Sequence, residues 1–254
     1  MQLIMFTKRL KELGNLSLEE AGKYVREMGF SGVELPVRRK GTPYVLPEEV
    51  KERLPEAVRT LESIGLSVPM ITIDITDAKE NYADDVFRTA SECGVKLLSL
   101  GAYRYQEFGT IKKRIGEARS QLKGIEALAR EYGVTAVIQT HSGAFTDPGH
   151  LALEGGIGGW KMGIDLLKDY TKVVAVKNFG WFQVIDEKTG EKKWAVRKMP
   201  LEDGIVPWPK ALEYIRKIGF DGCFSFYSPY DNLSFEELIE QTKRDLNYFQ
   251  TISK

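Results

Sequence analysis

The chain repeats a unit of amphipathic helix, glycine turn and short apolar run. The unit is clearest at residues 28–35 (MGFSGVEL) and 218–225 (IGFDGCFS). A glycine at such a junction can take the left-handed conformation that ends a helix. Apolar runs that alternate with helices predict a parallel sheet.

Eight apolar runs are candidate strands, at residues 3–6, 32–36, 68–74, 96–102, 135–141, 144–147, 173–179 and 223–227. Eight strands that alternate with helices predict an α/β fold of the (β/α)8 TIM-barrel type. Barrels of this kind take roughly 250 residues. The length of 254 residues therefore fits one domain that spans residues 1–254.

The interval between the fifth and sixth candidate strands is too short for a regular barrel. Only Ser142 and Gly143 separate the two runs, whereas a parallel crossover needs a dozen or more residues. We therefore expect a barrel whose crossover between the fifth and sixth strands is shortened or missing. The alternative is that the two runs form one bent element.

Local signals place two helix starts and one hairpin. Ser17 with Glu20, and Ser234 with Glu237, fit the capping box that begins a helix. The last helix carries an apolar face made of Phe235, Leu238, Ile239, Thr242, Leu246 and Phe249, which predicts packing against the barrel. Residues 181–185 and 194–196 flank the polar segment DEKTGEKK, which predicts a β-hairpin with a solvated tip.

Composition narrows the classes of function. Lys plus Arg and Asp plus Glu both number 36, so the net charge is zero, which argues against nucleic acid or an anionic membrane as the main partner. No apolar run approaches the ~20 residues of a membrane span. The first 14 residues, MQLIMFTKRLKELG, do not predict a signal peptide, because their apolar stretch is short and no small-residue cleavage site follows. Two cysteines are too few for a disulfide framework. We expect a cytoplasmic protein.

Candidate chemistry lies where the predicted strands end, because the active site of a parallel barrel forms there. The polar residues at these ends are Glu34, Asp74, Tyr103, Arg104, Gln139, His141, Asp147, His150, Lys177, Trp181 and Tyr227.

The imidazoles are the most informative of these groups. His141, in QTHSG at residues 139–143, can act as an acid, a base or a metal ligand near neutral pH, or serve as a structural rim residue. Asp147 precedes His150 by three residues. The pair can bind a divalent cation, or Asp147 can orient the imidazole; the other interpretation is a simple turn.

Four other candidates also have two interpretations. Lys177 can hold an anionic or hydroxyl-rich ligand or polarise a carbonyl, or it can form a rim salt bridge. Trp181 can stack on a sugar or pack in the protein. Glu154 can contact a ligand or stabilise a helix start. The run Arg38-Arg39-Lys40 can attract a phosphate or carboxylate, or form a solvated loop.

Several segments together resemble the sugar phosphate isomerase/epimerase proteins of the xylose isomerase-like TIM-barrel superfamily. They are GFSGVEL (29–35), QTHSG (139–143), DPGH (147–150) with EGG (154–156), VKNFGW (176–181), MPLEDGIV (199–206) and residues 219–228. The resemblance covers nearly the whole chain. It implies one divalent metal (Mn, Mg, Co or Zn), held by Glu, Asp, His and Glu from the last four strands. The metal would stabilise the charge of an enediolate.

The sequence departs from that ligand set. Gln139 stands where the first Glu is expected, and only Asp147 matches its position. Ala175 stands where the His is expected, and the last strand, FSFYSPY at 224–230, has no carboxylate or imidazole. The short crossover would also shift Asp147 and His150. A protein without a metal is therefore also compatible with the sequence.

Two hypotheses of function follow. In the first, the protein is an isomerase or epimerase for a sugar, sugar phosphate or polyol that moves a proton next to a carbonyl. The acid/base group would be His141 or His150, and Lys177 would also take part. The substrate-binding groups would be Glu34, Arg104, Gln139, Glu154 and Trp181. Asp147 would bind the metal.

In the second hypothesis, the protein is a non-catalytic member of the same barrel family that binds a carbohydrate or a partner. A third branch of the superfamily, the abasic-site endonucleases, needs a histidine-rich three-metal site, and two histidines exclude it. The expected ligand is a small-molecule carbohydrate, and the sequence leaves the oligomeric state open.

Overall fold

The computed structural model describes residues 1–104, 107, 109–138 and 156–254. The chain divides into two compact units. The amino-terminal unit is Gln2–Gly143, and the carboxy-terminal unit is Ala144–Lys254 together with Met1. The prediction of a single domain over residues 1–254 stays a prediction.

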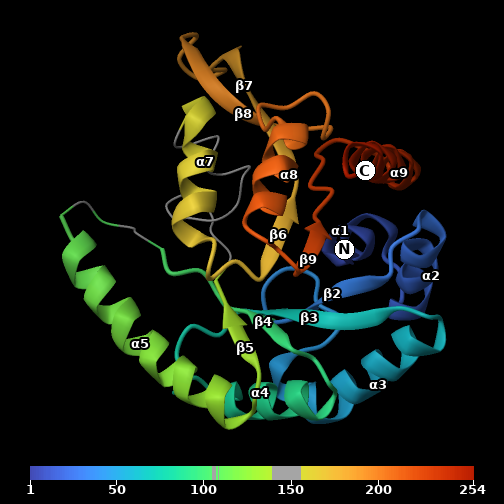
Figure 1. The fold of residues 1–254 in the computed structure, drawn as a ribbon, viewed down its shortest axis with the longest axis vertical. Coiled ribbons are helices and arrows are strands. Elements are labelled where there is room, and N and C mark those ends of the chain that lie inside the picture. Colours follow the sequence, from blue (N-terminus) through green and yellow to red (C-terminus); the bar gives the residue numbers. More distant parts are fainter. Residues whose placement is uncertain (105–106, 108, 139–155) are drawn as a thin grey trace. The chain divides into compact units, whose positions relative to one another are not determined.

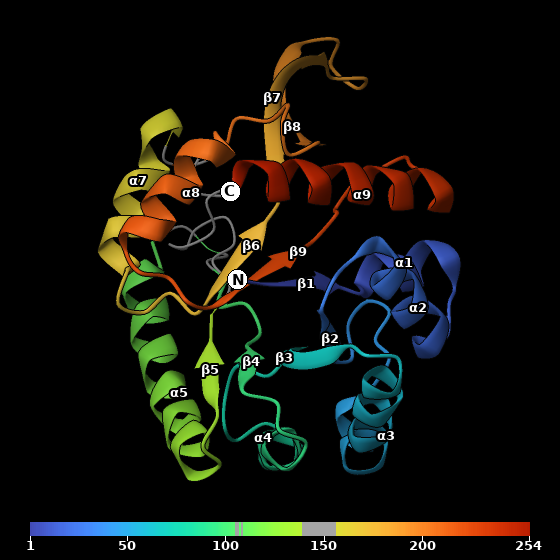
Figure 2. The same cartoon turned by 45° about the vertical axis from the view of Figure 1, so that its right-hand side comes forward.

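The amino-terminal unit alternates strands with helices, as predicted. Its elements are β1 (Gln2–Phe6), α1 (Lys8–Gly14), α2 (Leu18–Met28), β2 (Gly32–Val37), the 3₁₀ turn η1 (Pro47–Glu49), α3 (Val50–Ser63), β3 (Ser67–Ile73), α4 (Ala83–Glu92), β4 (Leu97–Ser99), α5 (Ile111–Glu131) and β5 (Thr135–Val137). The five strands pair in parallel in the order β5-β4-β3-β2-β1. Helices α3, α4 and α5 follow one side of this sheet (Figures 1 and 2).

Helix α2 shows how local sequence sets the elements of this unit. The Ser17 side chain accepts the backbone N–H of Glu20, and the Glu20 carboxylate accepts the backbone N–H of Ser17 at 2.9 Å. This is the predicted capping box. The helix ends at Gly29, whose φ of 99° is costly for any residue with a Cβ. Strand β2 then begins three residues later.

The carboxy-terminal unit contains α7 (Gly156–Leu167), β6 (Val173–Val176), β7 (Asn178–Ile185), β8 (Lys192–Met199), α8 (Trp208–Lys217), β9 (Cys223–Phe226) and α9 (Phe235–Ile252). Strands β6 and β9 pair in parallel. Helix α9 begins with the capping box predicted at Ser234 and Glu237. Its Phe249 ring contacts Phe224 and Phe226 of β9 edge-on, with centroids 5.2 Å apart, so the predicted packing of the last helix is confirmed.

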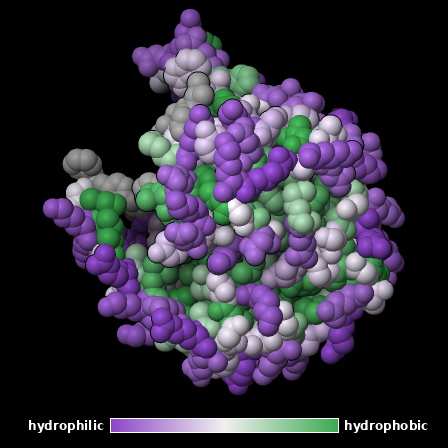
Figure 3. All heavy atoms as spheres, in the orientation of Figure 1, coloured by the Kyte–Doolittle hydropathy of each residue, from purple (hydrophilic) through white to green (hydrophobic). Residues whose placement is uncertain are grey.

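Strands β7 and β8 form the predicted hairpin, which Figure 1 shows as a long antiparallel ribbon. The predicted strand at 173–179 divides at Lys177, because residues before it pair with β9 and residues after it pair with β8. Charged side chains make the tip hydrophilic (Figure 3). The solvated tip is thus confirmed.

Six of the eight predicted strands occur with both ends within three residues of those expected. The strand predicted at 135–141 begins at Thr135 as expected, and residues 139–141 lie outside the described residues. Strand β4 is shorter than predicted, although the Leu100 and Gly101 N–H groups still bond to Val137 and Ile75 at 2.9 Å. The predicted strand 144–147 and the short interval before it lie outside the described residues. None of the helices in the described part of the chain is long and apolar enough to cross a membrane.

Candidate functional site

Glu34 of β2 is fully buried, and its surroundings hold its carboxylate in place. The residue is paired with Phe6 of β1 and Met70 of β3, in the middle of the parallel sheet. The Thr72 hydroxyl donates a hydrogen bond to Glu34 Oε1, and Thr72 is itself buried. A carboxylate is costly to bury without such partners. Glu34 is therefore a buried carboxylate on the sheet that a buried hydroxyl stabilises.

Lys177 lies where β6 ends and is 4% exposed. Its ammonium nitrogen lies 4.9 Å from the centre of the Tyr227 ring, which follows β9, and 5.8 Å from that of Phe179. Aromatic faces attract a cation at such distances. The structure thus brings together two predicted strand-end residues, Lys177 and Tyr227, and places the cation near two aromatic rings.

Lys177 lies on the face of the β6–β9 pair that points away from α9. Phe224 and Phe226 point toward α9, because their rings contact Phe249. Residues that alternate with them point to the opposite face, which places Ala175 and Ser225 there as directly paired neighbours. Both are buried. The Ala175 methyl group and the Ser225 hydroxyl therefore lie on this face, two residues before Lys177 and Tyr227 respectively.

These two positions do not fit a resident divalent metal of the kind that the sequence resemblance implies. Ala175 has no donor atom where a His is expected. Ser225 supplies a neutral hydroxyl on the strand where a carboxylate is expected. Among the residues described, no group of three or more His, Cys, Asp or Glu side chains is placed to hold a metal ion.

Arg104 and Trp181 lie on the surface of their respective units. Arg104 is exposed, and its backbone oxygen accepts a hydrogen bond from Arg114 at 3.4 Å. Trp181 is 45% exposed on the hairpin, opposite Val196 of β8. Neither contacts another predicted site residue through a hydrogen bond or ring contact within the described ranges, so their predicted roles in substrate binding stay predictions.

The other predicted site residues lie outside the described residues. They are the catalytic candidates His141 and His150, the substrate-binding candidates Gln139 and Glu154, and the metal candidate Asp147.

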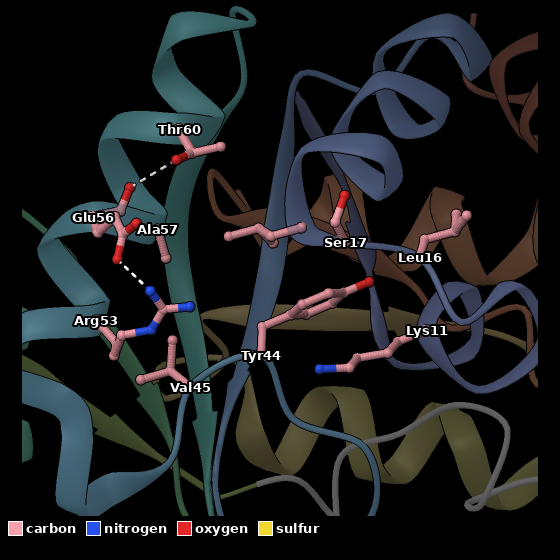
Figure 4. Close-up of a pocket in the computed structure, with 10 residues that line it drawn as sticks. Lys11, Leu16, Ser17, Tyr44, Val45, Arg53, Glu56, Ala57 and Thr60 are labelled. Atoms are coloured by element: carbon pink, nitrogen blue, oxygen red, sulfur yellow. Dashed lines mark hydrogen bonds and ion pairs between the residues drawn. The ribbon is translucent and has the colours of Figure 1, made fainter.

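One cavity was not expected from the sequence. It has a volume of about 250 Å³ and lies in the amino-terminal unit between α1, the start of α2 and α3. The Tyr44 ring projects into it between Ser17 and Lys11 (Figure 4). Lys11 Nζ lies 4.4 Å from the ring centre and donates to the Pro43 oxygen at 2.6 Å. Burial lowers the pKa of Lys11 and raises that of Tyr44.

A second unexpected feature is a buried polar cluster around Asn178 and Asp245 in the carboxy-terminal unit. Asn178 donates to the Leu201 and Val206 oxygens and accepts from the Val206 N–H at 2.9 Å. Asp245 accepts from the Leu201 N–H at 3.1 Å and from the Tyr230 hydroxyl. Burial is the main cause that raises the pKa of Asp245. This cluster fixes the segment 201–206 onto β7 and α9.

Comparison with known proteins finds likeness in structure alone. No protein-family model matches the sequence. No curated protein matches it either.

Among solved structures, a xylose isomerase-like TIM barrel protein from Mycobacterium smegmatis, in complex with magnesium, has a TM-score of 0.68 at 12% identity. The match covers 100% of this chain and 98% of that one. D-psicose 3-epimerase from Clostridium cellulolyticum H10, solved with D-tagatose, has a TM-score of 0.68 at 10% identity over 100% of both chains. The IOLI protein, with a bound zinc atom, has a TM-score of 0.68 at 15% identity over 99% of both.

These matches span whole chains and confirm the predicted fold. The chain has the α/β TIM-barrel-like fold of the xylose isomerase-like proteins.

Proposed function

We propose that the protein is an isomerase or epimerase of the xylose isomerase-like family, and that it moves a proton next to the carbonyl of a sugar, sugar phosphate or polyol-derived ketone. The observation that carries the proposal is Lys177, a buried lysine at the end of β6 that lies over the Tyr227 ring. A buried cation at the end of a barrel strand suits an oxygen that becomes negatively charged. The solved relative D-psicose 3-epimerase, by its name, catalyses a reaction of this kind.

The proposed chemistry needs a base and a group that stabilises charge. The base removes the proton from the carbon beside the carbonyl, and the electron pair moves to the carbonyl oxygen. The Lys177 ammonium donates a hydrogen bond to that oxygen and stabilises the enediolate-like charge. Return of the proton to the same carbon from the opposite side gives the epimer. Return to the former carbonyl carbon gives the isomer, provided that the hydroxyl proton of the neighbouring oxygen moves to the former carbonyl oxygen.

We propose the remaining roles on the basis of the sequence alone. His141 or His150 would act as acid and base near neutral pH. Gln139, Glu154, Arg104 and Trp181 would hold the sugar, and the buried Glu34 carboxylate would accept its hydroxyl groups. No step is assigned to a metal, because Ala175 and Ser225 do not fit the expected ligand set.

The decisive experiment measures proton transfer directly. The protein is incubated with a panel of ketoses, aldoses and their phosphates in D₂O, and deuterium at the carbon next to the carbonyl is followed by NMR. We expect exchange on at least one sugar and a loss of at least 100-fold in Lys177→Met. The matched control is Lys198→Met, an exposed lysine paired with Asp231 at 2.6 Å, which should exchange normally.

A second candidate function is a carbohydrate-binding protein without turnover. Two features favour it: Ala175 at the position where the resemblance expects a His ligand, and a last strand without a carboxylate or imidazole. Sugar binding without any deuterium exchange would overturn the enzymatic proposal and support this one.

A further inference from the structure

The loop after β2 holds one arginine at a fixed place. The Arg38 N–H donates to the Val45 oxygen at 3.2 Å, and Val37 forms a β-bridge with Val45. The loop is therefore closed at its base. The Arg39 N–H donates to Asp74 Oδ2, just after β3, at 3.0 Å. These bonds fix Arg38 and Asp74 at the carboxyl ends of neighbouring parallel strands, where barrel sites form.

Arg38 is half-buried and has unused hydrogen-bonding capacity. Its guanidinium carbon lies 5.6 Å from the centre of the Phe6 ring at the end of β1. Its Nε is buried without a hydrogen-bond partner in the described part of the chain. The neighbouring Arg39 differs, because it pairs with Glu48 at 3.4 Å. Buried donors without a partner are rare in native proteins, so the Arg38 Nε–H marks a position where a hydrogen-bond partner is missing.

Asp74 offers the complementary group. Its Oδ2 accepts the Arg39 N–H, while its Oδ1 is buried and accepts no hydrogen bond from the described residues. A third such atom, Thr42 Oγ1, lies in the same loop. One arginine donor, one carboxylate oxygen and one hydroxyl in the same loop region therefore have no hydrogen-bond partner among the described residues. Lys40 and Arg39, in the same loop, add positive charge.

We infer that this loop selects acidic carbohydrates, and that Arg38 binds the carboxylate or phosphate of the substrate while Asp74 accepts one of its hydroxyl groups. Arginine forms strong, charge-assisted bonds to both kinds of anion. A neutral sugar would leave the Arg38 donor as it is in the free protein and would gain no bond from it. The inference rests on the proposed carbohydrate function and names the substrate class for it.

The test compares acidic and neutral sugars with the whole protein. Dissociation constants for D-gluconate, D-fructose 6-phosphate and D-fructose are measured by calorimetry, on the natural chain and on Arg38→Met and Arg39→Met. We expect at least one of the two acidic ligands to bind at least tenfold more tightly than D-fructose. Arg38→Met should remove that preference and leave D-fructose binding unchanged, while Arg39→Met should keep it. Asp74→Asn should weaken all three ligands.

The outcomes separate the inference from the proposed function. Gluconate and fructose 6-phosphate distinguish a carboxylate from a phosphate as the preferred anion. Equal affinity for acidic and neutral sugars, or a preference that persists in Arg38→Met, would overturn the inference and leave the proposed function intact. If none of the three ligands binds and no sugar on the panel exchanges deuterium, both fail. Melting temperatures of the variants confirm that each remains folded.

Discussion

Two buried polar clusters in this chain differ in how completely their hydrogen bonds are made. Around Asn178 and Asp245, in the carboxy-terminal unit, each carboxamide or carboxylate oxygen has a donor. The donors are the backbone N–H groups of Phe179, Leu201 and Val206, the Tyr230 hydroxyl and the Gln241 amide. Around Arg38 and Asp74, in the amino-terminal unit, buried donors and acceptors lack partners in the described residues.

This difference distinguishes polar groups that stabilise the fold from polar groups that bind a ligand. A satisfied cluster stabilises one chain path, and removal of any member leaves several backbone groups without partners. An unsatisfied cluster costs stability in the free protein and recovers it when a ligand supplies the missing partners. The comparison predicts that substitutions in the first cluster reduce stability and that substitutions in the second reduce binding.

The largest expected effect is in the satisfied cluster. Asn178→Ala should lower the free energy of unfolding by about 3 kcal/mol, because two carbonyl oxygens and two N–H groups each lose a hydrogen bond. Urea unfolding followed by circular dichroism measures it. The matched control, Asn247→Ala on the exposed side of α9, should change stability by less than about 0.5 kcal/mol. Equal effects of the two substitutions would contradict the comparison.

In contrast to Asn178→Ala, Glu34→Gln should preserve stability and reduce activity. The Gln amide has nearly the same shape as the carboxyl group, and its oxygen can still accept the Thr72 hydroxyl. We expect unchanged or higher stability in urea unfolding, but at least a tenfold lower kcat/KM on a sugar that the natural protein turns over, about 1.4 kcal/mol. A loss of stability with full activity would identify Glu34 as a structural residue.

The fold could be predicted from the sequence because its signals are local. The Ser17 and Ser234 capping boxes and the glycine at position 29 each lie within a few residues of the element they define. The hairpin was predicted equally well, since its apolar runs flank an obvious polar tip. The division of the predicted strand 173–179 into two strands at Lys177 was not predicted, because the change of partner from β9 to β8 depends on residues that are distant in sequence.

The candidate site was predicted only in part. Lys177 and Tyr227 could be named as strand-end residues, but their contact depends on the β6–β9 register. Asp245 was missed, although its spacing from Thr242 and Phe249 places it on the buried face of α9. The Tyr44 cavity gave no signal, since it depends on how a loop closes over two helices.

The Tyr44 cavity provides a smaller test of the same comparison. The Tyr44 hydroxyl is buried without a hydrogen-bond partner in the described chain, whereas the Tyr103 hydroxyl donates to the Thr76 oxygen at 2.5 Å. Tyr44→Phe should therefore raise the free energy of unfolding by up to about 1 kcal/mol, and Tyr103→Phe should lower it by about 1 kcal/mol. Parallel urea titrations measure both. Destabilisation by Tyr44→Phe would mean that its hydroxyl is satisfied in solution.

The smallest effect concerns pH and Asp245. Burial raises the pKa of this carboxyl, so between the unfolded value of about 4 and the higher folded value the folded state holds more protons. The free energy of unfolding must therefore fall as pH rises through that interval and level off above the folded pKa.

Asp245→Asn removes the titrating group and keeps an oxygen that can accept the Leu201 N–H. Urea unfolding at a series of pH values from 4 to 8 should show a smaller decline with rising pH in this variant than in the natural protein. Identical slopes would mean that Asp245 is ionised in the folded state throughout, with the Tyr230 and Gln241 hydrogen bonds outweighing its burial. Asp245 would then be a buried carboxylate rather than a neutral acid. Replacement of Tyr230 would remove the hydroxyl that donates to this carboxylate and would greatly lower the free energy of unfolding.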